Sequence, residues 1–270
     1  MRGVPWFGGR APVLSWRRIG FATVALAVLA LGGCRKAEEA GSGGGKASID
    51  VLCGSSFVAP MEQLCSEFTK ETGIETAMST AGSEDFLPQV KAASVGDILV
   101  THDPFLDLVR EAGKLADHVE VGYVAPVLAV QKGNPKGLKS LEDLAKPGIK
   151  VALSNPEYST CGEMVFKLLE KKGIKDGVLA NVGNRLTKGH SQLGNLLKTK
   201  TVDAVVMWNG VAHTFGEAVD IVPVPYEYDT EIQLHVMSLN YSKHPEETKR
   251  FIAFLRKRGA ETFAEHGYVK

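Results

Sequence analysis

Two short serine-containing turns are the segments of this sequence best suited to binding chemistry. Gly54-Ser55-Ser56 follows an apolar run and leads into a helical pattern, and Ala81-Gly82-Ser83 also precedes a helical pattern. The free N–H groups of a helix start, the positive end of its dipole and a serine hydroxyl all favour an anion. A serine here is also an ordinary helix cap, so one such turn predicts little by itself. Two together predict helix starts that converge on one anionic ligand.

Uncharged donors of this kind suit a carrier protein. They hold an anion less tightly than a buried arginine pair would, so the ligand can later leave. Three further loops lie beside predicted helices or strands and are searched for the same reason, at residues 155–162, 188–191 and 208–210.

The overall charge agrees with a site built from local donors. The chain has 270 residues, with 31 Lys plus Arg and 31 Asp plus Glu, so its formal net charge is zero. This balance does not indicate a basic surface for nucleic acid. An anion site must therefore use nearby donors, because no strongly positive overall field is available.

Other chemistry finds little support in the sequence. We find no coherent set of acid, base and nucleophile and no Walker loop, so we expect neither an enzyme nor a cofactor. Cys161, His190 and His102 lack the close paired spacing of zinc ligands, so no metal site is expected.

The first 33 residues are typical of a lipoprotein signal peptide. Arg17 and Arg18 precede an apolar stretch at 19–31, which ends in Leu31-Gly32-Gly33-Cys34. That tetrapeptide is similar to a lipobox, in which the cysteine receives the lipid. The alternative is an uncleaved membrane anchor, but the stretch is shorter than the roughly 20 residues that a membrane helix needs. We expect an exported protein, lipid-anchored through Cys34 at the membrane and facing the periplasm or cell exterior.

A flexible tether at 34–47, rich in glycine and charge, connects this anchor to the folded part. From there apolar runs alternate with amphipathic stretches such as Met61, Leu64, Cys65 and Phe68, which lie on one face of a helix. This alternation predicts an α/β fold with mainly parallel sheets, whose ligands lie at the carboxyl ends of strands. We expect strands at 49–53, 74–78, 97–101, 123–131, 150–153, 203–208 and 233–240, and closing helices at 246–257 and 260–266.

Three cysteines remain after Cys34. Cys53 ends a predicted strand and Cys65 lies on the inward face of the next helix, so an exported protein could join them in a disulfide. The other expectation is two buried thiols that behave as small hydrophobes. With the disulfide formed, Cys161 would be left as an odd thiol in the candidate binding loop at 155–162.

The stretch from Lys132 to Leu144, KGNPKGLKSLEDL, continues through PGIKVAL at 147–153 to Asn155-Pro156-Glu157. On these residues the chain resembles the periplasmic molybdate-binding proteins of ABC importers, within the type II solute-binding class, from about Ser48 onward. The resemblance implies a two-lobed periplasmic-binding-protein-like fold with the ligand in the cleft. Lobe 1 would hold 48–124 and 226–270, and lobe 2 would hold 125–225.

The resemblance also assigns roles to single residues. Ser56 and Ser83 fall on its two hydroxyl positions, and Cys161 stands where a small residue offers its backbone N–H. A further backbone contact maps to His190, or to Ser191 if the alignment shifts, and Trp208 replaces a tyrosine. With the neighbours in the two turns, the expected ligand-binding residues are Ser55, Ser56, Gly82, Ser83, Cys161, His190 and Trp208.

The resemblance implies a monomeric solute-binding lipoprotein that delivers a small oxyanion, such as molybdate or tungstate, to an ABC permease and its ATPase. Glu84 and Asp85 depart from the pattern, which usually has small neutral or hydroxyl residues there. Each acid would repel a dianion by about 1 kcal/mol per unit of ligand charge at 4 Å in water-like surroundings. An oxyanion site requires them to point away from the cleft. With Trp208, they suggest the alternative of a different anionic, zwitterionic or cationic solute. A sensor for a membrane kinase is a further alternative with the same fold.

Overall fold

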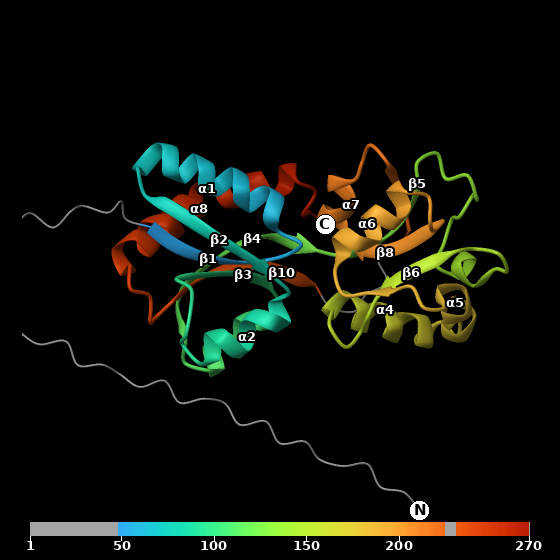
Figure 1. The fold of residues 1–270 in the computed structure, drawn as a ribbon, viewed down its shortest axis with the longest axis horizontal. Helices are drawn as coiled ribbons and strands as arrows, with labels where there is room; N and C mark the ends of the chain where they lie inside the picture. The colour runs from blue at the N-terminus through green and yellow to red at the C-terminus, as the bar shows by residue number, and fades with distance from the viewer. Residues whose placement is uncertain (1–47, 225–230, 270) are drawn as a thin grey trace, which may run out of the picture. The chain divides into compact units, whose positions relative to one another are not determined.

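Two five-stranded sheets flanked by helices make up residues 48–224 and 231–269, which the computed structural model describes (Figure 1). These residues belong to one compact unit spanning Gly43–Lys270. The predicted signal peptide, the lipid-anchor residue Cys34 and the tether lie outside the described residues. Among the residues described, no helix combines the length and apolar character needed to span a membrane.

The first sheet has the strand order β2-β1-β3-β10-β4. We call this sheet and its helices lobe 1. β1 pairs in parallel with β2 and β3, whereas β10 runs antiparallel to β3 and β4. The strands are β1 (Ser48–Gly54), β2 (Glu75–Ala81), β3 (Ile98–His102), β4 (Leu115–Val124) and β10 (Ile232–Leu239).

Helices cover both faces of this sheet (Figure 1). α1 (Val58–Thr72) and α8 (Pro245–Glu265) lie on one face, where Phe68 packs edge-on against Phe251 at 4.8 Å between ring centroids. The predicted stripe of Met61, Leu64, Cys65 and Phe68 is buried, because it faces the sheet. α2 (Ser83–Lys91) and α3 (Phe105–Glu111) pack a second, smaller core on the other face.

The second sheet has the order β7-β6-β8-β5-β9 and forms lobe 2 with its helices. α4 and α5 lie on one face, and α6 and α7 on the other (Figure 1). The strands are β5 (Pro126–Gln131), β6 (Val151–Ser154), β7 (Leu186–Thr187), β8 (Ala204–Trp208) and β9 (Val219–Val222). The helices are η1 (Glu142–Ala145, a 3-10 turn), α4 (Thr160–Lys171), α5 (Lys175–Val182), α6 (His190–Lys198) and α7 (Asn209–Thr214).

The predicted α/β class is confirmed, but the sheets are mixed rather than mainly parallel. Four of the eight strand pairings among the described residues are antiparallel. The chain enters β5 and β10 by crossing from the other lobe, so these strands run against their neighbours. Alternation of strands and helices along the chain does not reveal such crossings.

Two predicted elements have different bounds. The apolar run at 123–131 is not one strand: it breaks at Ala125 into β4 of lobe 1 and β5 of lobe 2. The two closing helices form the single helix α8, which continues through Gly259. That glycine allows close packing, since a Cβ there would lie 2.7 Å from Cγ1 of Val121.

Candidate functional site

A small pocket of about 30 Å³ lies where segments of both lobes meet. Lobe 1 contributes residues 54–57, 82–84 and His102, and lobe 2 contributes 158–160, 188–190 and Trp208. Ser55, Ser56, Gly82, Ser83, His190 and Trp208 were predicted from the sequence, and all six line this one pocket.

Four helix starts point their first residues at the pocket. Residues 54–57 precede α1, 82–84 open α2, 158–160 open α4 and 188–190 open α6. The first N–H groups of a helix lack partners within it, and its dipole places partial positive charge there. The two serine turns of lobe 1 and the loops at 155–162 and 188–191 of lobe 2 were the candidates from the sequence, and the helix starts that follow them all meet at this pocket. An anion can thus be surrounded by positive ends of helices although the chain has no net charge.

The two serine turns of lobe 1 are joined to each other. The Ser55 N–H donates to the Ala81 carbonyl at 2.8 Å, which continues the parallel pairing of β1 with β2. Ser83 is buried, and its Oγ accepts a hydrogen bond from Thr101 Oγ1 at 2.6 Å. Because Thr101 occupies an Oγ lone pair, the Ser83 hydrogen is free to donate into the pocket.

In lobe 2, hydrogen bonds fix the hydroxyl of Ser159 in a similar way. Ser159 is the N-cap of α4, and its Oγ accepts from the Gly162 N–H at 3.3 Å. His190 Nδ1 accepts from the Trp208 N–H at 3.2 Å, so the proton of the neutral ring is on Nε2, 3.4 Å from Ser159 Oγ. With two donors on its oxygen, Ser159 can direct its own hydrogen to a ligand.

Both imidazoles of the pocket are neutral at pH 7. Burial lowers the pKa of His190 to about 3, and the neighbouring His102 lowers it further in the same direction. Burial likewise lowers the pKa of His102 to about 4, although hydrogen bonding to Asp103 opposes this shift. Neither ring therefore presents an imidazolium to an anion: His102 directs its Nδ1–H to the Asp103 carbonyl at 2.6 Å, and His190 directs its Nε2–H toward Ser159.

Trp208 forms an aromatic wall. It is buried, stacks on His190 with 5.5 Å between centroids, and meets His102 edge-on at 5.6 Å. The indole thus holds the imidazoles of both lobes in place.

Tyr268, near the end of the chain, braces the first serine turn from behind. Its hydroxyl donates to the Ser56 carbonyl, and its ring packs edge-on against Phe57 at 5.7 Å. The same ring lies against Gly210 of lobe 2, where a Cβ would lie 2.2 Å from Cζ of Tyr268. Glycine is therefore required at that position.

Cys161 does not line the pocket. Its side chain is buried within lobe 2, and burial raises the pKa of the thiol well above its usual value. The preceding residues Ser159 and Thr160 line the pocket in its place. The side chain packs as a core residue because α4 turns it inward, while the contact expected from the backbone N–H of Cys161 stays a prediction.

The disulfide considered for Cys53 and Cys65 is absent, since both are free, buried thiols. Burial raises the pKa of both, that of Cys65 to about 11. The alternative expectation, of two thiols packed as hydrophobes, describes their state in this structure.

The two acids that follow Ser83 have different surroundings. Asp85 accepts from the Gly82 N–H at 3.3 Å and pairs across the lobes with Lys188 Nζ at 3.0 Å. Glu84 lines the pocket, and its Oε1 accepts from Thr160 Oγ1 of lobe 2 at 3.4 Å. An oxyanion site required both acids to point away from the cleft, and Glu84 does not. Burial is the main cause that raises its pKa, which favours its uncharged form.

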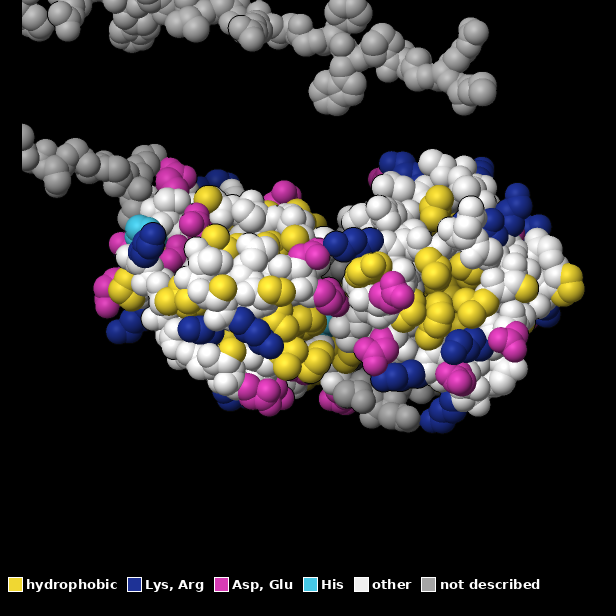
Figure 2. Space-filling model, turned by 60° about the horizontal axis from the view of Figure 1, so that its bottom comes forward, with side chains coloured by type: hydrophobic (Ala, Val, Ile, Leu, Met, Phe, Trp, Pro, Cys, Tyr) yellow, Lys and Arg dark blue, Asp and Glu magenta, His cyan; other side chains and the backbone are white. Residues whose placement is uncertain are grey.

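The surface around the junction carries both signs of charge. Figure 2 shows acidic and basic side chains facing each other across it, without a large region of one sign on this face. This agrees with a net charge of zero and with local donors as the source of any anion affinity.

Several pocket residues were missed, for identifiable reasons. His102 lines the pocket and Thr101 supports Ser83 from outside it; both end β3, which was predicted only as a core strand. Tyr158, Ser159 and Lys188 lie in loops that were searched, but nothing in their types distinguished them from capping or solvated residues. The useful signal was position, because each lies immediately before a helix.

Comparison with known proteins agrees with this fold. Residues 49–269 match the family described as bacterial extracellular solute-binding protein. A molybdate-binding protein ModA from Mycobacterium tuberculosis is 24% identical over 237 residues, covering 86% of this chain and 88% of the relative.

Solved structures of binding proteins share the fold. The sulfate-binding protein SubI from Mycobacterium tuberculosis superposes with a TM-score of 0.68 at 18% identity, covering 82% of this chain and 86% of that one. The periplasmic molybdate-binding protein from Azotobacter vinelandii gives 0.67 at 19% identity, covering 82% and 99%.

Proposed function

The chain belongs to the bacterial extracellular solute-binding protein family, and from this premise we propose that it captures a small tetrahedral oxyanion outside the cytoplasm. It is a solute-binding protein of the ABC importer type. In this proposal it holds the anion between its lobes and delivers it to a permease with an ATPase.

The observation that carries the proposal is the convergence of four helix starts and four serines, Ser55, Ser56, Ser83 and Ser159, on one small pocket. Hydroxyl and N–H groups donate hydrogen bonds, and helix starts favour negative charge. The donors come from both lobes, so a bound anion would hold the lobes together. Binding would then be linked to lobe closure, which is a state that a transporter can recognise.

The size of the pocket supports a ligand of few atoms. One water needs roughly 10–15 Å³ measured in this way, and the pocket offers about 30 Å³. A central atom with four oxygens is of this class. An amino acid or a sugar would require the lobes to separate.

The relatives' names favour molybdate and sulfate within this class. Neutral donors in a small pocket suit molybdate, tungstate and sulfate alike. We favour molybdate or tungstate, because the resemblance at 132–157 is to molybdate-binding proteins.

Glu84 favours a second candidate, an oxyanion that keeps a proton, such as hydrogen phosphate. An ionised carboxylate only accepts hydrogen bonds, so it would pair with an O–H group of the ligand. A fully deprotonated oxyanion instead requires Glu84 to be uncharged, which its raised pKa favours.

A ligand panel tests the proposal. Protein comprising residues 48–270 is heated with molybdate, tungstate, sulfate, thiosulfate or phosphate, and binding to the active anions is then measured by calorimetry. A ligand at 100 times its Kd should stabilise the fold by about 2.7 kcal/mol and raise Tm. The absence of a shift with every anion would contradict the oxyanion assignment.

Serine variants locate the site. Ser83→Ala removes a buried donor to a charged ligand, so affinity should fall by about 10- to 100-fold. Ser66→Ala is the matched control, because Ser66 is exposed on α1 away from the pocket. Equal affinities for both variants would place the ligand elsewhere.

The proposal includes export, lipid attachment at Cys34 and a monomeric protein. Mass spectrometry of the membrane fraction checks the anchor, since an intact Met1 terminus would refute it. Stimulation of a reconstituted importer's ATPase by the loaded protein separates transport from sensing for a membrane kinase.

A further inference from the structure

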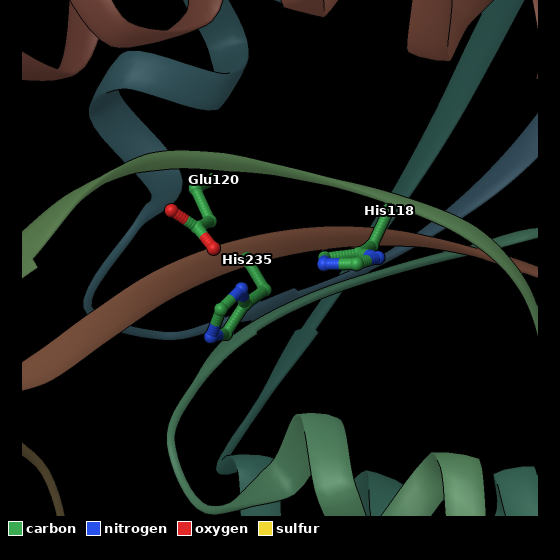
Figure 3. Close-up of side chains that lie close together, drawn as sticks. All are labelled: His118, Glu120 and His235. Carbon is green, nitrogen blue, oxygen red and sulfur yellow. The ribbon is translucent and has the colours of Figure 1, made fainter.

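Three potential metal ligands meet on the β4–β10 strand pair of lobe 1. His118 and Glu120 come from β4 and His235 from β10, and one ligand atom of each lies within 4.8 Å of the others. Figure 3 shows the Glu120 carboxyl next to the His235 ring, with the His118 ring alongside. We propose that these residues bind a divalent transition metal of the zinc class, at a site distinct from the oxyanion pocket.

The strand register brings the three side chains to one face. His235 lies opposite Glu120, and Met237 lies opposite His118, so His118 is the diagonal neighbour of His235. A bulge between Leu234 and His235 shifts the pairing by one residue. Bulges change the direction of side chains, and here the shift places His235 and Glu120 together.

His235 carries the strongest observation. Its side chain is 1% exposed, and its Nδ1 is buried without a hydrogen-bond partner. Its Nε2 lies 2.9 Å from Asp103 Oδ1. A carboxylate accepts, so Nε2 carries the proton and Nδ1 has a free lone pair. A buried nitrogen rarely lacks a partner, and a metal ion would supply one.

Asp103 orients this ring as carboxylates commonly orient metal-binding histidines. Its Oδ1 holds Nε2, and its Oδ2 accepts from the Gln233 N–H at 3.1 Å. This outer partner fixes both the tautomer and the ring plane of a metal ligand. Asp117 is not part of the set, because Arg256 Nη2 binds its carboxylate at 2.7 Å.

The donor set identifies the class of metal. Two imidazole nitrogens and one carboxylate suit zinc and its transition-metal neighbours, whereas calcium and magnesium prefer all-oxygen sites. Tetrahedral zinc places its ligand atoms about 3.4 Å apart, so the site must contract on binding. His118 is half-buried and Glu120 is exposed, and both can turn toward the fixed His235.

Titration of the metal-free full chain, purified in detergent, tests the site. We expect one Zn²⁺ per chain by calorimetry, a rise in Tm, and visible absorption of tetrahedral Co²⁺. His118→Ala and Glu120→Gln should each weaken Zn²⁺ binding at least about tenfold. These side chains are not fully buried, so the variants should fold even if a His235 variant does not.

The exposed His213 of lobe 2 provides the matched control, and His213→Ala should bind Zn²⁺ as the unaltered chain does. No saturable binding, or equal affinity in all variants, would overturn the metal site. Neither His118 nor Glu120 lines the oxyanion pocket, so the two proposals can fail separately.

Discussion

The two walls of the pocket present the same chemical group by different means. In lobe 1, Thr101 donates to Ser83, whereas in lobe 2 a ring held by a backbone N–H donates to Ser159. In both cases donors occupy the serine oxygen, one on Ser83 and two on Ser159, and leave the serine hydrogen for a ligand. The difference is in the support: lobe 1 relies on a hydroxyl of the central strand β3, and lobe 2 relies on a buried imidazole stacked on Trp208. Lobe 2 should therefore be the more fragile wall.

Removing the imidazole is the strongest test of that fragility. His190→Ala leaves a cavity beside Trp208 and leaves the buried Trp208 N–H without its acceptor. We expect the free energy of unfolding to fall by about 2–4 kcal/mol, measured by urea denaturation. His213→Ala should have little effect, because that ring is exposed. If His190→Ala lowers the free energy of unfolding no more than His213→Ala does, lobe 2 is not the more fragile wall.

The same substitution should change the response to acid. The pKa of His190 falls from 6.5 to about 3 on folding, so the unfolded chain binds the proton first. Stability should therefore decrease as the pH falls below about 6.5, and His190→Ala should reduce that slope. An unchanged slope would show that the ring does not titrate as its burial predicts.

The lobe 1 wall is tested through its orienting hydroxyl. Thr101→Val keeps the shape but removes the donor to Ser83, so that the serine hydrogen is no longer directed to the ligand. Oxyanion affinity should fall by about tenfold in calorimetry. Thr262→Val is the matched control, because this equally buried hydroxyl has no hydrogen-bond partner. Similar affinities in both variants would contradict the orienting role.

Glu84 makes the walls unequal in charge. Burial raises the pKa of Glu84, so its carboxylate is protonated at a higher pH than that of an exposed glutamate. Its repulsion of a bound anion therefore decreases as the pH falls. Affinity for molybdate or sulfate should rise as the pH falls through this pKa. Glu84→Gln should bind the anion about three- to tenfold more tightly and with less pH dependence than the parent. Protonation of the ligand itself affects both proteins equally, so it does not contribute to the difference in pH dependence between them.

Exposed Glu163 supplies the control for this comparison. Glu163 stands in the first turn of α4 but does not line the pocket, so Glu163→Gln should leave the pH dependence of oxyanion affinity unchanged. Weaker binding in Glu84→Gln would instead support a ligand that donates a proton to the carboxylate.

The ion pair between Lys188 and Asp85, which joins the two lobes at the edge of the pocket, should have the smallest effect on oxyanion affinity. Lys188 and Asp85 have side chains that are 58% and 43% exposed, so solvent screens their attraction. Lys188→Met and Asp85→Asn should each weaken oxyanion binding by less than about threefold at low salt, because both break one contact between the lobes. Stronger binding in Asp85→Asn would show that the acid acts through its charge on the ligand.

The sequence was informative where local rules decide the structure. The serine turns were found because a glycine, a hydroxyl and a following helix lie within a few residues of one another. The stripe on α1 was correct because its period of 3.6 faces a sheet. Six of the seven expected ligand-binding residues line the pocket. The side chain of Cys161 packs inward, and the contact expected from its backbone N–H stays a prediction.

What the sequence could not show depends on distant partners. The support of Ser83 by Thr101 joins residues that are 18 apart, and that of Ser159 by His190 joins residues 31 apart. The break at Ala125 was missed because two apolar strands in different sheets read as one run. The cluster of His118, Glu120 and His235 depends on the pairing of β4 with β10, with a bulge that no local pattern predicts.

Tyr268 connects the segment after α8 directly to the first serine turn of the pocket. Its hydroxyl is attached to the Ser56 carbonyl, while its ring rests on Gly210 of the opposite lobe. In the proposed opening of the lobes, this ring would slide across the glycine. An environment-sensitive fluorophore attached near the C-terminus would therefore convert solute capture into an optical signal without touching the residues that hold the solute.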